Sequence, residues 1–107
     1  MSDKAWKAFE RRVAEYFGSE RTPLSGGNSK VTRSDTFHPT LFIEAKQAVR
    51  HAVWTLHDKT KALARLESKT PLLVLSRKGS PGFMICIHSD NFDLICNIRR
   101  KRRKARW

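Results

Sequence analysis

The chain has 107 residues, enough for one domain with a hydrophobic core but few enough that oligomerisation would help to stabilise it. Hydrophobic residues make up 39% of the chain, which argues against disorder, and 22 Lys and Arg against 10 Asp and Glu give a net charge of +12. This charge favours polyanionic partners, nucleic acid first and anionic membrane second.

The chain carries no signal for a membrane or an oxidising compartment. No apolar run reaches the roughly 18 residues that a membrane-spanning helix needs, and the N-terminus lacks the apolar region of a signal peptide. We therefore expect a soluble, cytoplasmic protein with no membrane partner. Cys86 and Cys96 lack the spacing of a zinc site, so we expect two buried structural thiols.

The first predicted element is a helix that follows Ser2 or Asp3, runs to about Phe17 and ends at Gly18. Its buried face consists of apolar residues at helical spacing: Trp6, Phe9, Val13, Tyr16 and Phe17. Glu10 falls on the same face, where a carboxylate is costly unless something pairs with it. Two explanations stay open: an edge position with a salt bridge in the neighbourhood of Arg11 or Arg12, or a third acid that reaches a functional site.

A polar loop rich in Gly and Ser follows from residue 18 to residue 30, with Arg21 and Lys30 near its ends. It lacks the spacing of a Walker phosphate loop, so a surface linker is the commoner interpretation. Residues 31–34 are then predicted as a short strand that leads to Asp35.

The stretch from residue 34 to residue 46, S-D-T-F-H-P-T-L-F-I-E-A-K, predicts a chemical site. Its last six residues are predicted as a strand, because apolar residues run up to the charged ones. Glu44 and Lys46 would then project from one face. If Asp35 ends a neighbouring strand, two carboxylates and an ammonium converge, which suits a hard divalent cation. The alternative is an ordinary solvated strand face.

A long helix is predicted from about residue 47 to residue 68. Its apolar face would comprise Val49, Ala52, Val53, Leu56, Thr60, Leu63 and either Leu66 or Glu67. Trp54 and His57 flank this stripe, either as helix packing residues or as part of a subunit interface. Two further apolar runs, residues 72–76 and 83–87, are predicted as strands, and the first has the composition of a strand buried on both faces.

The resulting order of elements favours an α/β protein with a central mixed β-sheet flanked by helices. A short apolar segment, residues 92–98, would end a single domain spanning residues 1–98. The remaining residues, 99–107, form a tail with seven Lys and Arg and no acid. Such a run is usually disordered when free and binds phosphate backbones without sequence preference. The expected contacts are Arg99, Arg100, Lys101, Arg102 and Arg103.

Taken together, these pieces resemble the archaeal Holliday junction resolvases and their phage relatives, within the PD-(D/E)XK nuclease superfamily. The resemblance is carried by the helical Glu10, the loop Arg21-Thr22-Pro23-Leu24-Ser25-Gly26, Asp35, and the strand motif Glu44-Ala45-Lys46. It covers most of residues 6–80. The E-x-K motif alone is weak, and its combination with the serine loop and the helical Glu is more specific. Ser34 stands where the family motif has Pro, and the C-terminal part of the chain matches no part of the family pattern.

The resemblance implies a restriction-endonuclease-like fold and a metal-dependent endonuclease that resolves four-way junctions in branched DNA. Asp35, Glu44 and the backbone carbonyl of Ala45 would hold Mg²⁺, with Mn²⁺ as an alternative, and Glu10 would either complete the ligand set or support it from outside. Paired incisions in a symmetric junction would require a homodimer. No small-molecule cofactor is implied.

The resemblance also assigns the phosphate contacts. Lys46 would orient the attacking water or offset charge in the transition state. Ser25 would contact the scissile phosphate from a mobile loop. As clamps for neighbouring phosphates we select the basic residues Arg21, Lys30 and Arg33.

Three alternatives remain beside the junction-resolving enzyme. The first is another nuclease on the same fold, such as a nickase, a flap or repair nuclease, or a restriction-type enzyme. The second is a basic DNA-binding protein that keeps the fold without catalysis. The third is a nuclease that acts on RNA, because a metal and two carboxylates do not distinguish the two sugars.

Overall fold

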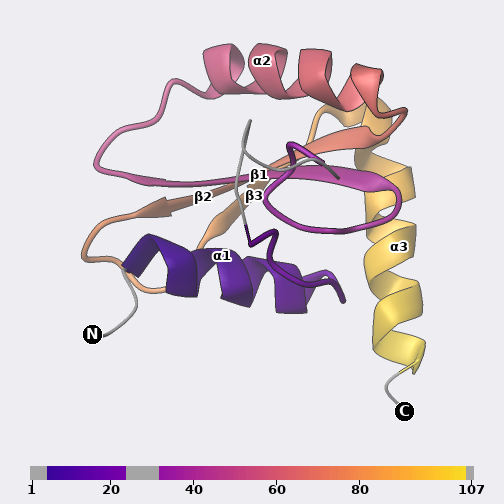
Figure 1. Ribbon diagram of the computed structural model, residues 1–107, viewed down its shortest axis with the longest axis horizontal. Coiled ribbons are helices and arrows are strands. Elements are labelled where there is room, and N and C mark those ends of the chain that lie inside the picture. Colours follow the sequence, from indigo (N-terminus) through magenta and orange to yellow (C-terminus); the bar gives the residue numbers. More distant parts are fainter. Residues whose placement is uncertain (1–4, 24–31, 106–107) are drawn as a thin grey trace.

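The computed structural model describes residues 5–23 and 32–105, with side chains up to residue 98. Figure 1 shows the ribbon, coloured along the chain from the N-terminus to the C-terminus. Its elements are α1 (Ala5–Tyr16), β1 (Leu41–Ala48), α2 (Val53–Leu66), β2 (Thr70–Arg77), β3 (Met84–Cys86), the 3-10 helix η2 (Ser89–Asn91) and α3 (Phe92–Ala105).

The three strands form one mixed sheet in the order β1-β2-β3. β1 and β2 are parallel over eight residue pairs, from Leu41 opposite Thr70 to Ala48 opposite Arg77. β3 is antiparallel to β2 and pairs with its middle. In Figure 1, α2 covers one face of the sheet, α1 lies against the other, and α3 runs beside the sheet towards the level of α1. The fold is therefore α/β with a mixed sheet between helices, which confirms the predicted class.

The main core lies between α1 and the sheet. Phe9, Val13 and Phe17 are at most 4% exposed and recur every four residues, so they form one stripe on the helix. They meet alternate strand residues and one residue of α3, namely Leu41, Ile43, Ala45, Leu72, Val74 and Ile95. The predicted stripe is confirmed for these three residues. Its outer members, Trp6 and Tyr16, are 38% and 37% exposed.

The predicted apolar face of α2 is wrong in part. β1 continues to Ala48, so the helix begins at Val53 rather than near residue 47. Val49, Ala52 and Val53, expected on the buried stripe, are exposed. Of the two alternatives at its end, Leu66 is 80% exposed and Glu67 is half-buried. Thr60 is buried as predicted, and Ala64, which was not predicted, is buried beside it, because short side chains let the helix backbone come close to the sheet.

Two further expectations change. No strand forms in residues 32–34, and residue 31 lies outside the described residues. The apolar segment expected at residues 92–98 is the first half of α3, which continues to Ala105 across the expected domain boundary. Cys86 and Cys96 are free but half-buried rather than buried. No helix in the described part of the chain has the length and apolar composition needed to cross a bilayer.

The packing of α1 predicts a large stability difference between two Phe→Ala variants. Phe9→Ala empties a site that is 1% exposed and should lower the free energy of unfolding by ~3–5 kcal/mol. Phe92→Ala removes a ring that is 56% exposed and should cost less than ~1 kcal/mol. Urea unfolding followed by circular dichroism measures both. Equal losses would contradict the core described here.

Candidate active site

A pocket of about 570 Å³ opens at the carboxyl end of β1. The carboxyl ends of parallel strands meet at one edge of a sheet, where α/β proteins commonly bind ligands. The pocket is lined by Ala5, Trp6, Glu10, Asp35, Glu44, Ala45, Lys46, Gln47 and Lys78. The structure thus brings together four residues that the sequence singled out, Glu10, Asp35, Glu44 and Lys46.

Asp35 reaches this pocket without a strand of its own. Its backbone N–H donates to the Ile43 carbonyl (3.0 Å), and its Oδ2 accepts from the Ala45 N–H (2.8 Å). Ser34 adds a second tie, because its hydroxyl accepts from the Ile43 N–H (2.9 Å) and donates to the Ile43 carbonyl (3.1 Å). The Asp35 backbone N–H and the two side chains therefore pair with the open edge of β1, where the sequence predicted a neighbouring strand.

Glu10 fits both explanations that the sequence left open. It lines the acidic pocket and is only 6% exposed. Its Oε1 also accepts from Nε of Arg21 at 2.8 Å, so its partner is an arginine of the following loop rather than Arg11 or Arg12. The Arg21 guanidinium lies over the Trp6 ring, 5.4 Å from the ring centre. This pair fixes the Glu10 carboxylate and leaves Arg21 bound to protein rather than free for a phosphate.

The three acids are held where their charged forms are unfavourable. Burial raises the pKa of Asp35 to about 7, and the nearby Glu44 carboxylate adds to the effect. Burial also raises the pKa of Glu10 to about 7, with a contribution from Asp35. The pKa of Glu44 is raised by burial although Lys46 acts in the opposite direction. Buried carboxylates of this kind keep protons unless a cation compensates their charge.

The donor set fits a hard divalent cation. Asp35 and Glu44 supply carboxylate oxygens, and Ala45 lies between Glu44 and Lys46 on the wall of the same pocket. Among the described residues, no three Asp, Glu, His or Cys side chains are already grouped as metal ligands. Two carboxylates would therefore need backbone carbonyl and water oxygens to complete a coordination shell, as is usual for Mg²⁺.

Three lysines lie near the acids. Lys46 lowers the pKa of both Asp35 and Glu44, and Lys59 of α2 lowers that of Glu44. Lys78 lines the pocket from the turn after β2. The sequence analysis missed Lys59 and Lys78. The sequence could have indicated Lys78. A basic turn that directly follows a buried strand parallel to β1 must lie at the same end of the sheet as Lys46.

Other predicted contacts do not line the pocket or cannot be placed. Arg33 is exposed, and its backbone N–H donates to Oε2 of Glu67 at 3.0 Å, beyond the end of α2. Ser25 and Lys30 lie outside the described residues, as do the side chains of the tail residues Arg99, Arg100, Lys101, Arg102 and Arg103.

No protein-family model, curated protein or solved structure matches this chain. Its function is therefore inferred from the geometry and charges of its own residues, together with the motif resemblance.

The serine tie to β1 predicts a specific loss of stability. Ser34→Ala removes the hydroxyl that accepts from the Ile43 N–H and leaves this buried donor unpaired, which costs ~1–3 kcal/mol, whereas the Ile43 carbonyl still accepts from the Asp35 N–H. Ser89→Ala, at an exposed position in η2, is the matched control and should change the free energy of unfolding by less than ~0.5 kcal/mol. Urea unfolding measures both, and an unchanged midpoint for Ser34→Ala would refute the tie.

The raised pKa values predict how stability depends on pH. The folded Asp35 keeps its proton to about pH 7, whereas the unfolded chain loses it near pH 4, so rising pH between these values destabilises the fold. Burial lowers the pKa of His38, so this residue makes the fold more stable as the pH rises, opposite to Asp35. Asp35→Asn keeps His38, so the difference between wild type and this variant reports the effect of Asp35.

Without divalent cations, wild type should lose at least about 1.4 kcal/mol more than Asp35→Asn between pH 5 and pH 7.5. Mg²⁺ should restore the loss at pH 7.5 in wild type alone, because it replaces the protons. Denaturant unfolding at the two pH values measures this difference. Parallel curves for the two proteins would exclude a buried, proton-holding Asp35.

Proposed function

We propose that this protein is a metal-dependent endonuclease that hydrolyses phosphodiester bonds in branched DNA, with the four-way junction as its preferred substrate. One observation carries the proposal: Glu10, Asp35 and Glu44 share a pocket in which burial raises their pKa values, and Lys46 lies beside them. Carboxylates that are costly to charge, placed in an open pocket beside two lysines, suit a site completed by a cation and a phosphate.

The two central carboxylates have a binding role. Asp35 and Glu44, with the Ala45 carbonyl, would hold Mg²⁺ or Mn²⁺. A cation there would supply a Lewis acid that polarises a phosphate oxygen and lowers the pKa of a water molecule. The Ala45 N–H fixes one oxygen of Asp35, so this carboxylate is oriented before any ligand arrives. Such pre-orientation saves reorganisation at the moment of reaction.

The lysines would offset the negative charge of the substrate. The exposed Lys46 and the pocket residue Lys78 would contact oxygens of the scissile phosphate or its neighbour, where negative charge builds up in the transition state. Lys59 would act further out by reducing the repulsion between Glu44 and the phosphate. Glu10 and Arg21 are positioning residues in this scheme, because each fixes the other at the pocket wall.

The substrate class follows from the charge and from the resemblance. A net charge of +12 favours binding along a phosphate backbone, and no element of the sequence is suited to reading base edges, so specificity would come from DNA shape. A symmetric dimer of the restriction-endonuclease-like fold would present two acidic pockets to two strands. A DNA-binding protein without catalysis would leave the costly burial of these acids unexplained.

The decisive experiment uses a labelled four-way junction and a linear duplex of matching sequence, each with Mg²⁺ or with EDTA. Wild type should make paired, metal-dependent cuts in the junction. Glu44→Gln should reduce the cleavage rate at least about hundredfold, because it removes a carboxylate that binds the cation and stabilises the transition state.

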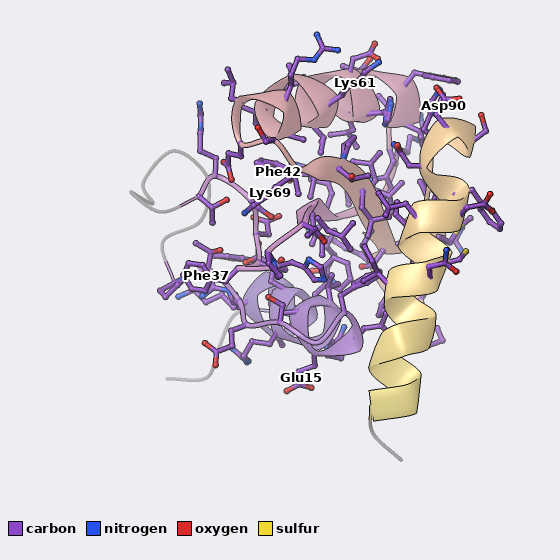
Figure 2. All side chains as sticks on the ribbon, turned by 90° about the vertical axis from the view of Figure 1, so that its right-hand side faces the viewer. Glu15, Phe37, Phe42, Lys61, Lys69 and Asp90 are labelled. Atoms are coloured by element: carbon purple, nitrogen blue, oxygen red, sulfur yellow. The ribbon has the colours of Figure 1, made fainter. Side chains whose placement is uncertain are left out.

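Glu15→Gln is the matched control. Glu15 projects from the outer side of α1 in Figure 2 and is exposed, so this variant should cut at the wild-type rate. Equal cleavage of junction and duplex would keep the nuclease and reject the preference for junctions. Tight junction binding without any cleavage would reject the enzyme.

A further inference from the structure

A second pocket, of about 400 Å³, lies at the other end of the sheet from the acidic pocket. The carboxyl end of β1, where the acidic pocket opens, is on the left in Figure 1, and the C-terminal end of α2, beside which this second pocket lies, is on the right. Cationic and imidazole groups dominate its lining. The residues that matter are His57, Lys61, Arg65, Lys69, His88 and Asp90.

A row of donors follows α2 along this pocket. His57, Lys61 and Arg65 recur every four residues, so they lie on one ridge of the helix with a rise of about 6 Å between neighbours. Figure 2 shows Lys61 on the outer side of α2. Within the described parts of the chain, neither Lys61 nor Arg65 forms an ion pair. Lys69 differs, because its Nζ lies 3.4 Å from Oε1 of Glu67.

An apolar hollow adjoins the cationic pocket and shares two of its residues. The imidazoles of His57 and His88 stack, with 5.3 Å between ring centres and 16° between planes, and they line both spaces. Trp54 meets each of them edge to face, at 6.1 and 6.4 Å. The hollow is floored by Leu73 and Cys86. The Trp54 side of the hollow faces solvent, because this indole is 71% exposed.

We propose that this face of α2 binds a single DNA strand, with phosphates on Lys61 and Arg65 and an unpaired base against Trp54. Unpaired cations beside an open aromatic surface are the pattern of single-strand binding, in which basic groups follow the backbone and bases stack on aromatic rings. A paired base cannot offer its face to Trp54, which is why the ligand is a single strand rather than a duplex. The choice of DNA rests on the proposed function, in which this site would hold a strand separated from the duplex that is cut.

Asp90 offers a variant that should raise the affinity for the strand, where the other variants should lower it. Its carboxylate lies on the rim of the cationic pocket, 3.6 Å from Nδ1 of His88, and its side chain is 84% exposed. Figure 2 shows it at the upper end of the ribbon that continues into α3. A phosphate in the pocket would be repelled by this charge. Asp90→Asn should therefore strengthen binding, whereas loss of Lys61 or Arg65 should weaken it.

The experiment measures fluorescence anisotropy of a labelled single-stranded oligonucleotide with the full chain, in EDTA and at several salt concentrations. Lys61→Ala combined with Arg65→Ala should weaken binding at least about tenfold and reduce the salt slope by ~1.4, because each single-strand phosphate contact contributes ~0.7. Trp54→Ala should weaken binding at least about fivefold with an unchanged slope, since it removes stacking but no charge. Asp90→Asn should tighten binding.

The matched control removes two cations elsewhere, Lys7→Ala with Arg12→Ala on α1, and should change affinity less than about threefold. Equal effects of the two double variants, or no effect of Trp54→Ala, would overturn the proposal. Poly-glutamate offers charge without bases. Its displacement of the oligonucleotide at equal charge concentration would identify the face as a site for acidic protein instead. Circular dichroism confirms that each variant is folded.

Glu44→Gln separates this proposal from the proposed nuclease. If the α2 variants bind as wild type while Glu44→Gln abolishes cleavage, the α2 site fails and the nuclease stands. If wild type never cuts but the α2 variants lose binding, the nuclease fails and the strand site stands.

Discussion

The contact on which this structure depends is the attachment of Ser34 and Asp35 to the outer edge of β1. The Ala45 N–H holds the Asp35 carboxylate, and the Ser34 hydroxyl pairs with both backbone groups of Ile43. With only two residues, these bonds pair backbone groups of β1 that a fourth strand would otherwise have to pair. They also place a charged side chain directly beside Glu44, so one set of hydrogen bonds completes the sheet and assembles the acidic pocket. A proline at position 34 would lack the hydroxyl that makes half of this attachment.

The pocket carries an electrostatic cost that the rest of the chain offsets. Three carboxylates are partly removed from water, which raises their pKa values, and the basic side chains around them come from different elements. Arg21 comes from a loop, Lys46 from β1 and Lys59 from α2. Each of these cations lowers the pKa of at least one of the three acids. A protein with a net charge of +12 can hold buried acids in this way without becoming repulsive to polyanions.

Much of this arrangement could be predicted from local patterns. The stripe of Phe9, Val13 and Phe17 and the strand that carries Glu44 and Lys46 follow from periodicity, because one face of each must meet a core. The start of α2 could not be predicted. Residues 47 to 52 suit a helix by themselves, and β1 extends through Ala48 because pairing with β2 outweighs that local preference. The Arg21–Glu10 pair joins residues eleven apart through a loop, which no periodic pattern encodes.

The two edges of the sheet differ, and the difference affects how readily the protein aggregates through them. The outer edge of β1 is occupied by Ser34 and Asp35, so it offers few free backbone groups to another chain. The other edge strand is β3, which has only three residues and pairs with β2 within the described part of the chain. A foreign strand would find too short a template there to extend the sheet. The fold can therefore carry a strand as apolar as β2 at its centre and still resist edge-to-edge aggregation at high protein concentration.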